Sequence, residues 1–219
     1  GLADGERFAR AVGGADVCIR CAAHAEDAHD AGHARAHDKG DAARLFHEQA
    51  EYCRDHDHDD RNDAEFRLET VLATIPRDMP CEIAFFGGSF TGIDRDLMVY
   101  LLNLATSYVY AGRVRAIRFS TRPDYITPEI VRILARYPIG MAELGIQSMS
   151  DRVLAACDRG HTAVDTVTAC GLLRDAGIPY GGQMMLGLPE STAEDERECA
   201  AAIAALGCTE SRIYPTIVF

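Results

Sequence analysis

The sequence predicts an α/β fold built from parallel strands, and two observations support that prediction. Five short apolar runs alternate with helical patterns between residues 81 and 219, which is typical of repeated β/α units. Glycine-rich or polar residues directly follow four of these runs, at 87–89, 120–124, 147–148 and 187–189. Active sites of parallel β/α proteins lie at the carboxyl ends of strands, so four such ends favour a barrel over an open doubly wound sheet.

The elements follow one another in a regular order. An apolar stripe from Phe66 to Ile75 predicts a helix that ends before Pro76. Apolar runs predict strands at 82–86, 114–119, 141–146, 180–186 and 211–218. Helical patterns lie between them, at 97–110, 128–137, 151–157, 163–176 and 192–206. Pro128 near the start of one helix and Thr192 as the N-cap of another fit the usual preferences at these positions.

Composition excludes several classes of protein. The chain has 219 residues, of which 47% are hydrophobic, so it can build a substantial core. No run approaches the 18 or so apolar residues of a transmembrane helix, and no secretory leader is recognisable. We therefore expect a cytoplasmic protein with reduced cysteines. The net charge of −12 argues against non-specific binding to nucleic acid.

The chain divides into two parts of different character. Residues 1–63 are rich in His, Asp and Ala, and they hold seven of the eight histidines. Their apolar residues are too sparse for a core face, so we expect an irregular or disordered leader. Residues 64–219 carry the β/α pattern, and His161 is their one histidine.

Several residues at the strand ends are candidates for binding. Gly87, Gly88 and Ser89 leave backbone groups open after a strand, although a tight turn would have the same composition. They do not form a phosphate-binding P-loop, because no Gly-Lys-Ser/Thr follows. Glu143 lies inside an apolar strand, where a carboxylate is costly unless it is paired or faces a polar cavity. His161 is the weaker candidate, since a structural cap or hydrogen bond explains it better than a catalytic role.

Six motifs together resemble one family. They are Phe85-Phe-Gly-Gly-Ser-Phe-Thr-Gly-Ile93, Ser120-Thr-Arg-Pro-Asp-Tyr-Ile126, Glu143-Leu-Gly-Ile-Gln-Ser-Met149, Arg159-Gly-His-Thr162, Gln183-Met-Met-Leu-Gly-Leu-Pro189 and Arg212-Ile-Tyr-Pro215. In order and spacing they resemble the radical S-adenosylmethionine (SAM) superfamily. More narrowly, they are similar to the radical SAM domain of bacterial proteins akin to the catalytic subunit of elongator. The resemblance runs from about residue 64 to residue 219.

The resemblance implies a partial TIM-like (β/α)6 barrel and a particular chemistry. Family members cleave SAM reductively at a [4Fe–4S] cluster, and the resulting 5′-deoxyadenosyl radical attacks a substrate. The substrate here is unknown, and an RNA is one candidate. A reductant such as flavodoxin or ferredoxin would supply the electron. By the same resemblance, the SAM-binding residues are Gly87, Gly88, Ser89, Gln147, Arg159, Gln183 and Tyr214. Ser120 stands where some relatives carry Glu, and the family usually continues beyond the last strand.

The cluster motif departs from the family pattern. The family uses Cys-x3-Cys-x2-Cys, in which three thiolates hold three irons and leave the fourth for SAM. Cys18 and Cys21 match the last two positions, whereas Gly14 occupies the first. No strongly apolar strand precedes the pair. No catalytic residue can be assigned from the sequence.

Several explanations of this departure stay open. The protein can be a cluster-free relative that acts as a binding or partner module. Alternatively, Cys53 or a histidine completes an unusual site, or His29, His33 and His37 bind a metal along one helical face. Residues 1–63 can also be translated out of frame, which would explain their composition.

Overall fold

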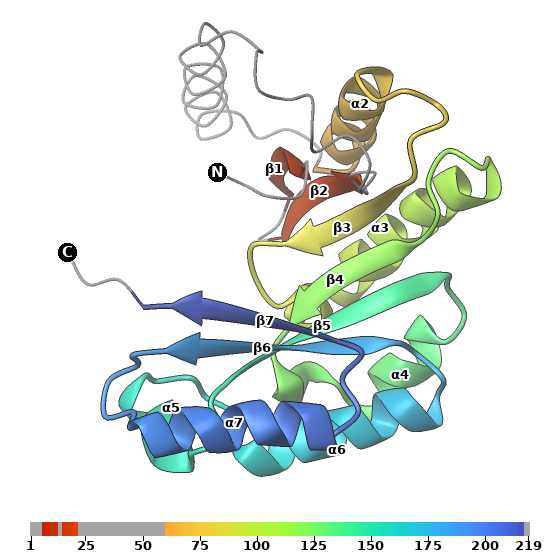
Figure 1. Ribbon diagram of the computed structural model, residues 1–219. Coiled ribbons are helices and arrows are strands. Elements are labelled where there is room, and N and C mark those ends of the chain that lie inside the picture. The colour runs from red at the N-terminus through yellow and green to blue at the C-terminus, as the bar shows by residue number, and fades with distance from the viewer. Residues whose placement is uncertain (1–5, 13–14, 22–59, 217–219) are drawn as a thin grey trace, which may run out of the picture.

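The computed structural model describes the backbone of residues 6–12, 15–21 and 60–216, and the side chains of residues 64–216. Seven strands form one sheet in the order β1 to β7. They are β1 (Glu6–Val12), β2 (Ala15–Cys21), β3 (Cys81–Phe86), β4 (Ile117–Thr121), β5 (Ile139–Gln147), β6 (Tyr180–Leu186) and β7 (Glu210–Pro215). Strands β3 to β7 are parallel. This sequential order is that of a curled half-barrel (Figure 1), which confirms the predicted partial barrel.

Six α-helices are described, of which the first precedes β3 and the other five lie between the parallel strands. They are α2 (Asp60–Ala73), α3 (Arg95–Tyr110), α4 (Pro128–Leu134), α5 (Asp151–Ala156), α6 (Ala163–Asp175) and α7 (Ala193–Ala205), with 3-10 turns η3 (Phe90–Gly92) and η4 (Pro123–Tyr125). Thr162 and Thr192 cap α6 and α7, each in a reciprocal capping box with the Asp three residues later. The N-cap predicted at Thr192 is therefore confirmed. No helix among the described residues is long and apolar enough to cross a membrane.

The two faces of the sheet differ because side chains alternate along a strand. Ile83, Phe85, Ile117 and Phe119 belong to the core cluster, which also includes apolar residues of the helices. The rings of Phe85 and Phe90 stack with their centroids 4.5 Å apart. Alternate strand residues therefore face the inside of the half-barrel, where polar side chains gather.

Two strands in the first part of the chain differ from the sequence-based expectation. Strands β1 and β2 pair antiparallel, and β2 continues antiparallel onto β3. The pattern of 6–12, in which Arg and Ala follow Phe8, is too weakly apolar to predict a strand. These segments form backbone hydrogen bonds with each other, and β2 also forms them with the edge of β3. The expected leader segments at 22–59 lie outside the described residues.

Candidate functional site

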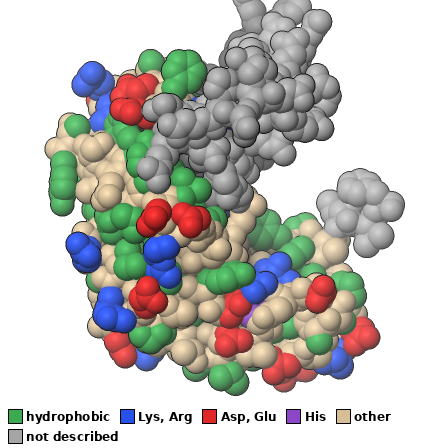
Figure 2. Space-filling view, turned by 180° about the vertical axis from the view of Figure 1, so that it is seen from behind, with side chains coloured by type: hydrophobic (Ala, Val, Ile, Leu, Met, Phe, Trp, Pro, Cys, Tyr) green, Lys and Arg blue, Asp and Glu red, His purple; other side chains and the backbone are tan. Residues whose placement is uncertain are grey.

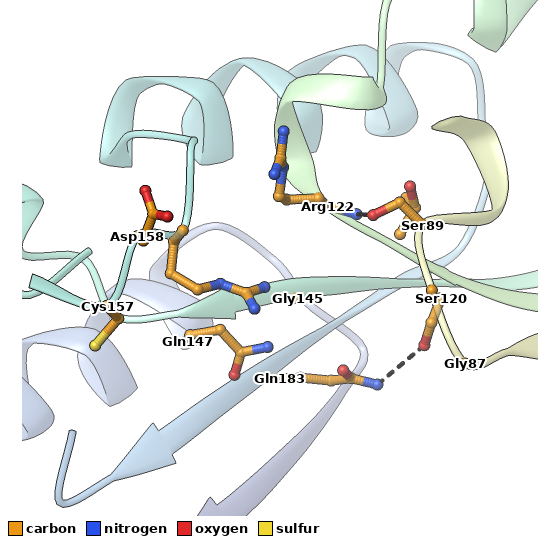
Figure 3. A pocket seen from close by; sticks show the side chains of 12 residues that line it. Gly87, Ser89, Ser120, Arg122, Gly145, Gln147, Cys157, Asp158 and Gln183 are labelled. Atoms are coloured by element: carbon orange, nitrogen blue, oxygen red, sulfur yellow. Dashed lines mark hydrogen bonds between the residues drawn. The ribbon is translucent and has the colours of Figure 1, made fainter. Parts of the chain in front are cut away.

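A pocket of about 420 Å³ lies at the carboxyl ends of the parallel strands (Figure 3). Its walls come from the residues that follow β3, from the ends of β4 and β5, from β6 and from the loop after α5. The lining residues are Gly87, Gly88, Ser89, Ser120, Thr121, Arg122, Gly145, Gln147, Cys157, Asp158, Arg159 and Gln183. We call this cavity the rim pocket. It unites Gly87, Gly88, Ser89, Gln147, Arg159 and Gln183, which the resemblance assigned to one site.

The turn after β3 is held in place by two contacts. Gly87 has a φ of 91°, in the left-handed region that favours glycine. The Ser89 hydroxyl accepts a hydrogen bond from the backbone N–H of Arg122 at 3.3 Å. Farther along, the buried hydroxyls of Thr91 and Thr121 lie 2.7 Å apart. The turn is therefore fixed to the end of β4, with its backbone open to the pocket.

Glu143 lies at the centre of a polar network inside the half-barrel. One carboxylate oxygen accepts from Arg118 at 2.8 Å and lies 3.0 Å from a guanidinium nitrogen of Arg212. The other accepts from the Gln183 amide at 2.6 Å. The side chain is 3% exposed, so the predicted need of this Glu for polar partners is confirmed.

Arg118 links this network to the neighbouring strands. Its guanidinium donates to Glu82 of β3 at 3.0 Å and to Glu210 of β7 at 3.0 and 3.3 Å. Burial lowers the pKa of Arg118, but hydrogen bonds to Glu210, Glu143 and Glu82 outweigh that effect, so the pKa is raised. The buried Arg118 guanidinium therefore joins carboxylates of β3, β5 and β7 on the inner face of the sheet.

Gln147 and Arg159 have polar atoms that the surrounding protein does not satisfy. The carbonyl oxygen of Gln147 and Nε of Arg159 are buried and have no hydrogen-bond partner among residues 64–216. Gln147 also has a φ of 65°, which is strained for a residue with a side chain. Strain and unpaired polar groups gather at functional sites, so both features point to a ligand.

Gly145 makes room for both side chains. A Cβ at this position would lie 3.1 Å from Nε2 of Gln147 and 3.5 Å from a guanidinium nitrogen of Arg159. Sequence reasoning did not name Gly145 as a site residue, although a glycine inside an apolar strand is itself a signal of close approach. Cys157, Asp158 and Thr121 also line the pocket without having been named.

Two arginines line the pocket, and they differ in their partners. Asp124 accepts two hydrogen bonds from Arg122 at 2.6 and 2.7 Å, and the Arg122 guanidinium carbon lies 4.7 Å from the centre of the Tyr125 ring. Arg159 pairs with no carboxylate of the described part of the chain. Burial and the charge of Arg122 lower the pKa of Arg159. An anionic group of a ligand would therefore be favoured beside Arg159.

Of the other residues assigned from the sequence, Tyr214 lies outside the rim pocket, and only the backbone register of Cys18 and Cys21 is described. Tyr214 lies in β7 and does not line the pocket, and its side chain is 42% exposed. Cys18 pairs with Ala84 in the middle of β3, and Cys21 pairs with Cys81, at its amino end. Because β2 runs antiparallel to β3, the chain carries Cys21 away from the rim. The backbone register therefore does not bring this pair toward the predicted SAM site.

The residues present can be tested against the two cofactors implied by the resemblance. The rim pocket fits SAM. The unpartnered carbonyl oxygen of Gln147 can accept from a hydroxyl or ammonium group of SAM, and the guanidinium of Arg159 can pair with its carboxylate. Among residues 64–216, no three His, Cys, Asp or Glu side chains are grouped to hold a metal. The described cysteines, at 81, 157, 170, 199 and 208, are free thiols. The described residues therefore do not fit a three-thiolate iron–sulfur site.

Comparison with known proteins agrees with the motifs. The chain is 34% identical over 86 residues to a tRNA uridine(34) acetyltransferase of Methanocaldococcus infernus, covering 39% of this chain and 16% of the relative. It is 40% identical over 119 residues to a tRNA-2-methylthio-N(6)-dimethylallyladenosine synthase of Geobacter sulfurreducens, covering 48% of this chain and 27% of the relative. The chain thus spans less than a third of either relative.

A solved structure shares the fold. An archaeal Elp3 from Methanocaldococcus infernus, with an N-terminal deletion, superposes with a TM-score of 0.60 at 24% identity. The match covers 72% of this chain and 42% of that one. The sequence model of the radical SAM superfamily, whose cofactors are SAM and a [4Fe–4S] cluster, matches residues 31–203. Because this match covers well over half of the chain, the protein belongs to the radical SAM superfamily.

Proposed function

We propose that the rim pocket binds SAM. The open backbone of Gly87 and Gly88, with Ser89, would accept from the methionine ammonium group. Arg159 would pair with the carboxylate, and Gln147 and Gln183 would accept from the ribose hydroxyls. The assignment of Tyr214 to the adenine end of SAM rests on the family resemblance alone, since Tyr214 does not line the pocket.

One observation carries this proposal: Gln147 and Arg159 each bury an unpartnered polar atom at the same pocket. An unsatisfied buried polar group costs about 1–3 kcal/mol. A ligand that offers a donor to Gln147 and an acceptor to Arg159 would remove both penalties. SAM offers hydroxyls, an ammonium group and a carboxylate within one molecule.

A calorimetric titration of the full chain with SAM tests the proposal. Arg159→Met should weaken binding by about 10–100-fold, because a hydrogen bond to a charged group contributes roughly 1.5–3 kcal/mol. The matched control is Arg136→Met, an exposed arginine in the turn after α4, which should bind as the parent chain does. Equal affinities of the parent chain and Arg159→Met would reject the assignment.

We also propose that the chain cleaves SAM reductively, a step that needs an iron–sulfur cluster. No side chain among residues 64–216 is assigned to hold that cluster. Cys18 and Cys21 are still the ligands that the motif suggests, but their register on β3 is unfavourable. That same register favours the second candidate, a cluster-free SAM-binding or partner module. Anaerobic reconstitution with iron and sulfide separates the two. Absorbance near 400 nm together with 5′-deoxyadenosine, formed with a flavodoxin or ferredoxin reductant, supports the enzyme, whereas SAM binding without either supports the module.

We also propose an RNA substrate, on the strength of the tRNA substrates in the names of the relatives. Acidic and basic side chains are interspersed on the face in Figure 2, so recognition would rest on local contacts rather than a general positive field. Filter binding of unmodified tRNA to the full chain, at about 0.15 M salt, tests this proposal against a single-stranded DNA control. Preference for tRNA supports it, and equal retention of both contradicts it.

A further inference from the structure

The Gln183 amide is held on its nitrogen side. Nε2 donates to Glu143 Oε2 at 2.6 Å and lies 3.3 Å from the Ser120 hydroxyl oxygen. An amide nitrogen has two hydrogens, so both are engaged. Figure 3 shows the nitrogen turned to Ser120 and the carbonyl oxygen turned away from it, on a side chain that lines the rim pocket. That oxygen has no partner among residues 64–216, which leaves an acceptor for a ligand.

Glu143 can only accept from Gln183 in this arrangement. Its Oε1 is engaged by guanidinium groups of Arg118 and Arg212, at 2.8 and 3.0 Å. An ion-paired carboxylate has no hydrogen to donate. The two ends of an amide are nearly the same size, so packing alone would not choose between them. The charge of Glu143 therefore makes that choice.

We infer that Glu143 is a positioning residue that fixes the Gln183 carbonyl oxygen toward the rim pocket, so that this site selects a ligand group with an O–H or N–H donor. The inference rests on the proposed function only for the identity of the ligand as SAM. Glu143 itself does not line the pocket. It acts through Gln183, and the ligand touches only the amide.

A single substitution should reverse the amide. In Glu143→Gln, Arg118 and Arg212 would hold the new carbonyl oxygen, and the new NH2 would point to Gln183. Gln183 must then accept from residue 143, so its own NH2 turns to the pocket. The pocket would present a donor where the parent chain presents an acceptor, with almost no change in volume.

A second substitution should restore the acceptor. In the double variant Glu143→Gln with Gln183→Glu, the amide at 143 donates to the carboxylate at 183. The other carboxylate oxygen then faces the pocket and accepts as the parent amide does. Gln183→Glu alone would place two carboxylates within hydrogen-bond distance, and we expect it to lower the unfolding midpoint.

The first test measures SAM affinity of the full chain by calorimetry. Glu143→Gln should weaken binding about tenfold, since one lost hydrogen bond contributes about 1.4 kcal/mol. The double variant should bind SAM with an affinity within about threefold of that of the parent chain. Glu82→Gln is the matched control, because Glu82 also pairs with Arg118 but does not contact Gln183. Equal binding by Glu143→Gln and Glu82→Gln would overturn the inference.

The second test needs no ligand. Hydrogen exchange of the Gln183 side-chain amide, followed by NMR and assigned with Gln183→Glu, should be slow in the parent chain and faster in Glu143→Gln. Unchanged exchange would overturn the positioning role even if SAM binds. If the parent chain does not bind SAM, the proposed function fails, while the exchange measurement still decides the role of Glu143.

Discussion

The hydroxyls of Thr91 and Thr121 lie 2.7 Å apart and are buried between the turn after β3 and the end of β4. Both residues are less than 7% exposed. Each hydroxyl therefore depends on the other for a partner inside the protein. This pair fixes the Gly87–Ser89 turn against the strand that carries Ser120 and Arg122.

Substitution of either threonine by valine should reveal this dependence. Thr91→Val or Thr121→Val alone leaves one buried hydroxyl unsatisfied, and each should lose about 1–3 kcal/mol of stability. The double variant removes both hydroxyls and should lose less than the sum of the two. Urea unfolding of the four proteins gives the coupling energy. Simple additivity would show that the two hydroxyls do not depend on each other.

Gly145→Ala should damage the rim pocket and leave the fold intact. The added methyl group would lie 3.1 Å from Nε2 of Gln147 and would displace that side chain. We expect SAM affinity to fall about tenfold, which corresponds to roughly 1.4 kcal/mol. Gly171→Ala is the control, because its Cβ in α6 meets only a distant Arg174 nitrogen, at 3.9 Å. That variant should gain about 0.5–1 kcal/mol of stability and bind normally.

Gln147→Gly should separate stability from binding. Its φ of 65° costs about 1–2 kcal/mol for a residue with a side chain. Glycine relieves that strain, so the unfolding midpoint in urea should not fall, whereas SAM affinity should drop. Glu190→Gly relieves a similar φ of 62° outside the pocket and should leave affinity unchanged. A large loss of stability in Gln147→Gly would contradict the assignment of strain.

His161 should make the stability of the chain depend on pH. Its Nε2 lies 3.2 Å from the carbonyl oxygen of Ile146, its Nδ1 has no partner among the described residues, and it is 5% exposed. Burial lowers the pKa of His161, and the charge of Arg159 adds to that effect. The unfolded chain therefore takes up a proton more readily than the folded one.

The sign of the effect follows from this difference. The stability contribution of a neutral His161 is complete above its unfolded pKa of about 6.5 and declines as the pH falls toward the folded value. His161→Gln should show a flatter decline between pH 7.5 and 5.5. Because the chain has seven other histidines, the measured quantity is the difference between the parent chain and the variant at each pH. Parallel pH profiles would contradict the prediction.

Some of the site was predictable because physical rules act locally. Glu143 lies in an apolar strand, and the cost of burying a carboxylate required polar partners, which Arg118 and Gln183 supply. The strand ends were predictable from periodicity, and parallel topology then brought them together. The residues that follow β3, β4 and β5 therefore meet in one pocket, as expected.

Other features depend on tertiary register, which one sequence does not reveal. Cys18 and Cys21 have the spacing of a ligand pair, yet antiparallel pairing with β3 sets Cys21 opposite Cys81. The role of Gly145 is visible only in the folded chain, where its missing Cβ leaves space for the side chains of Gln147 and Arg159. Strand β4 also starts at Ile117 rather than Val114, although the backbone N–H of Arg115 already donates to the Cys81 carbonyl oxygen of β3.

A crystal of the full chain soaked with SAM would show whether the rim pocket is the binding site. We expect density for SAM in the rim pocket, with its carboxylate within hydrogen-bond distance of Arg159 and a hydroxyl or ammonium donor at Gln183. SAM bound elsewhere on the chain, with the rim pocket filled only by water, would contradict this expectation.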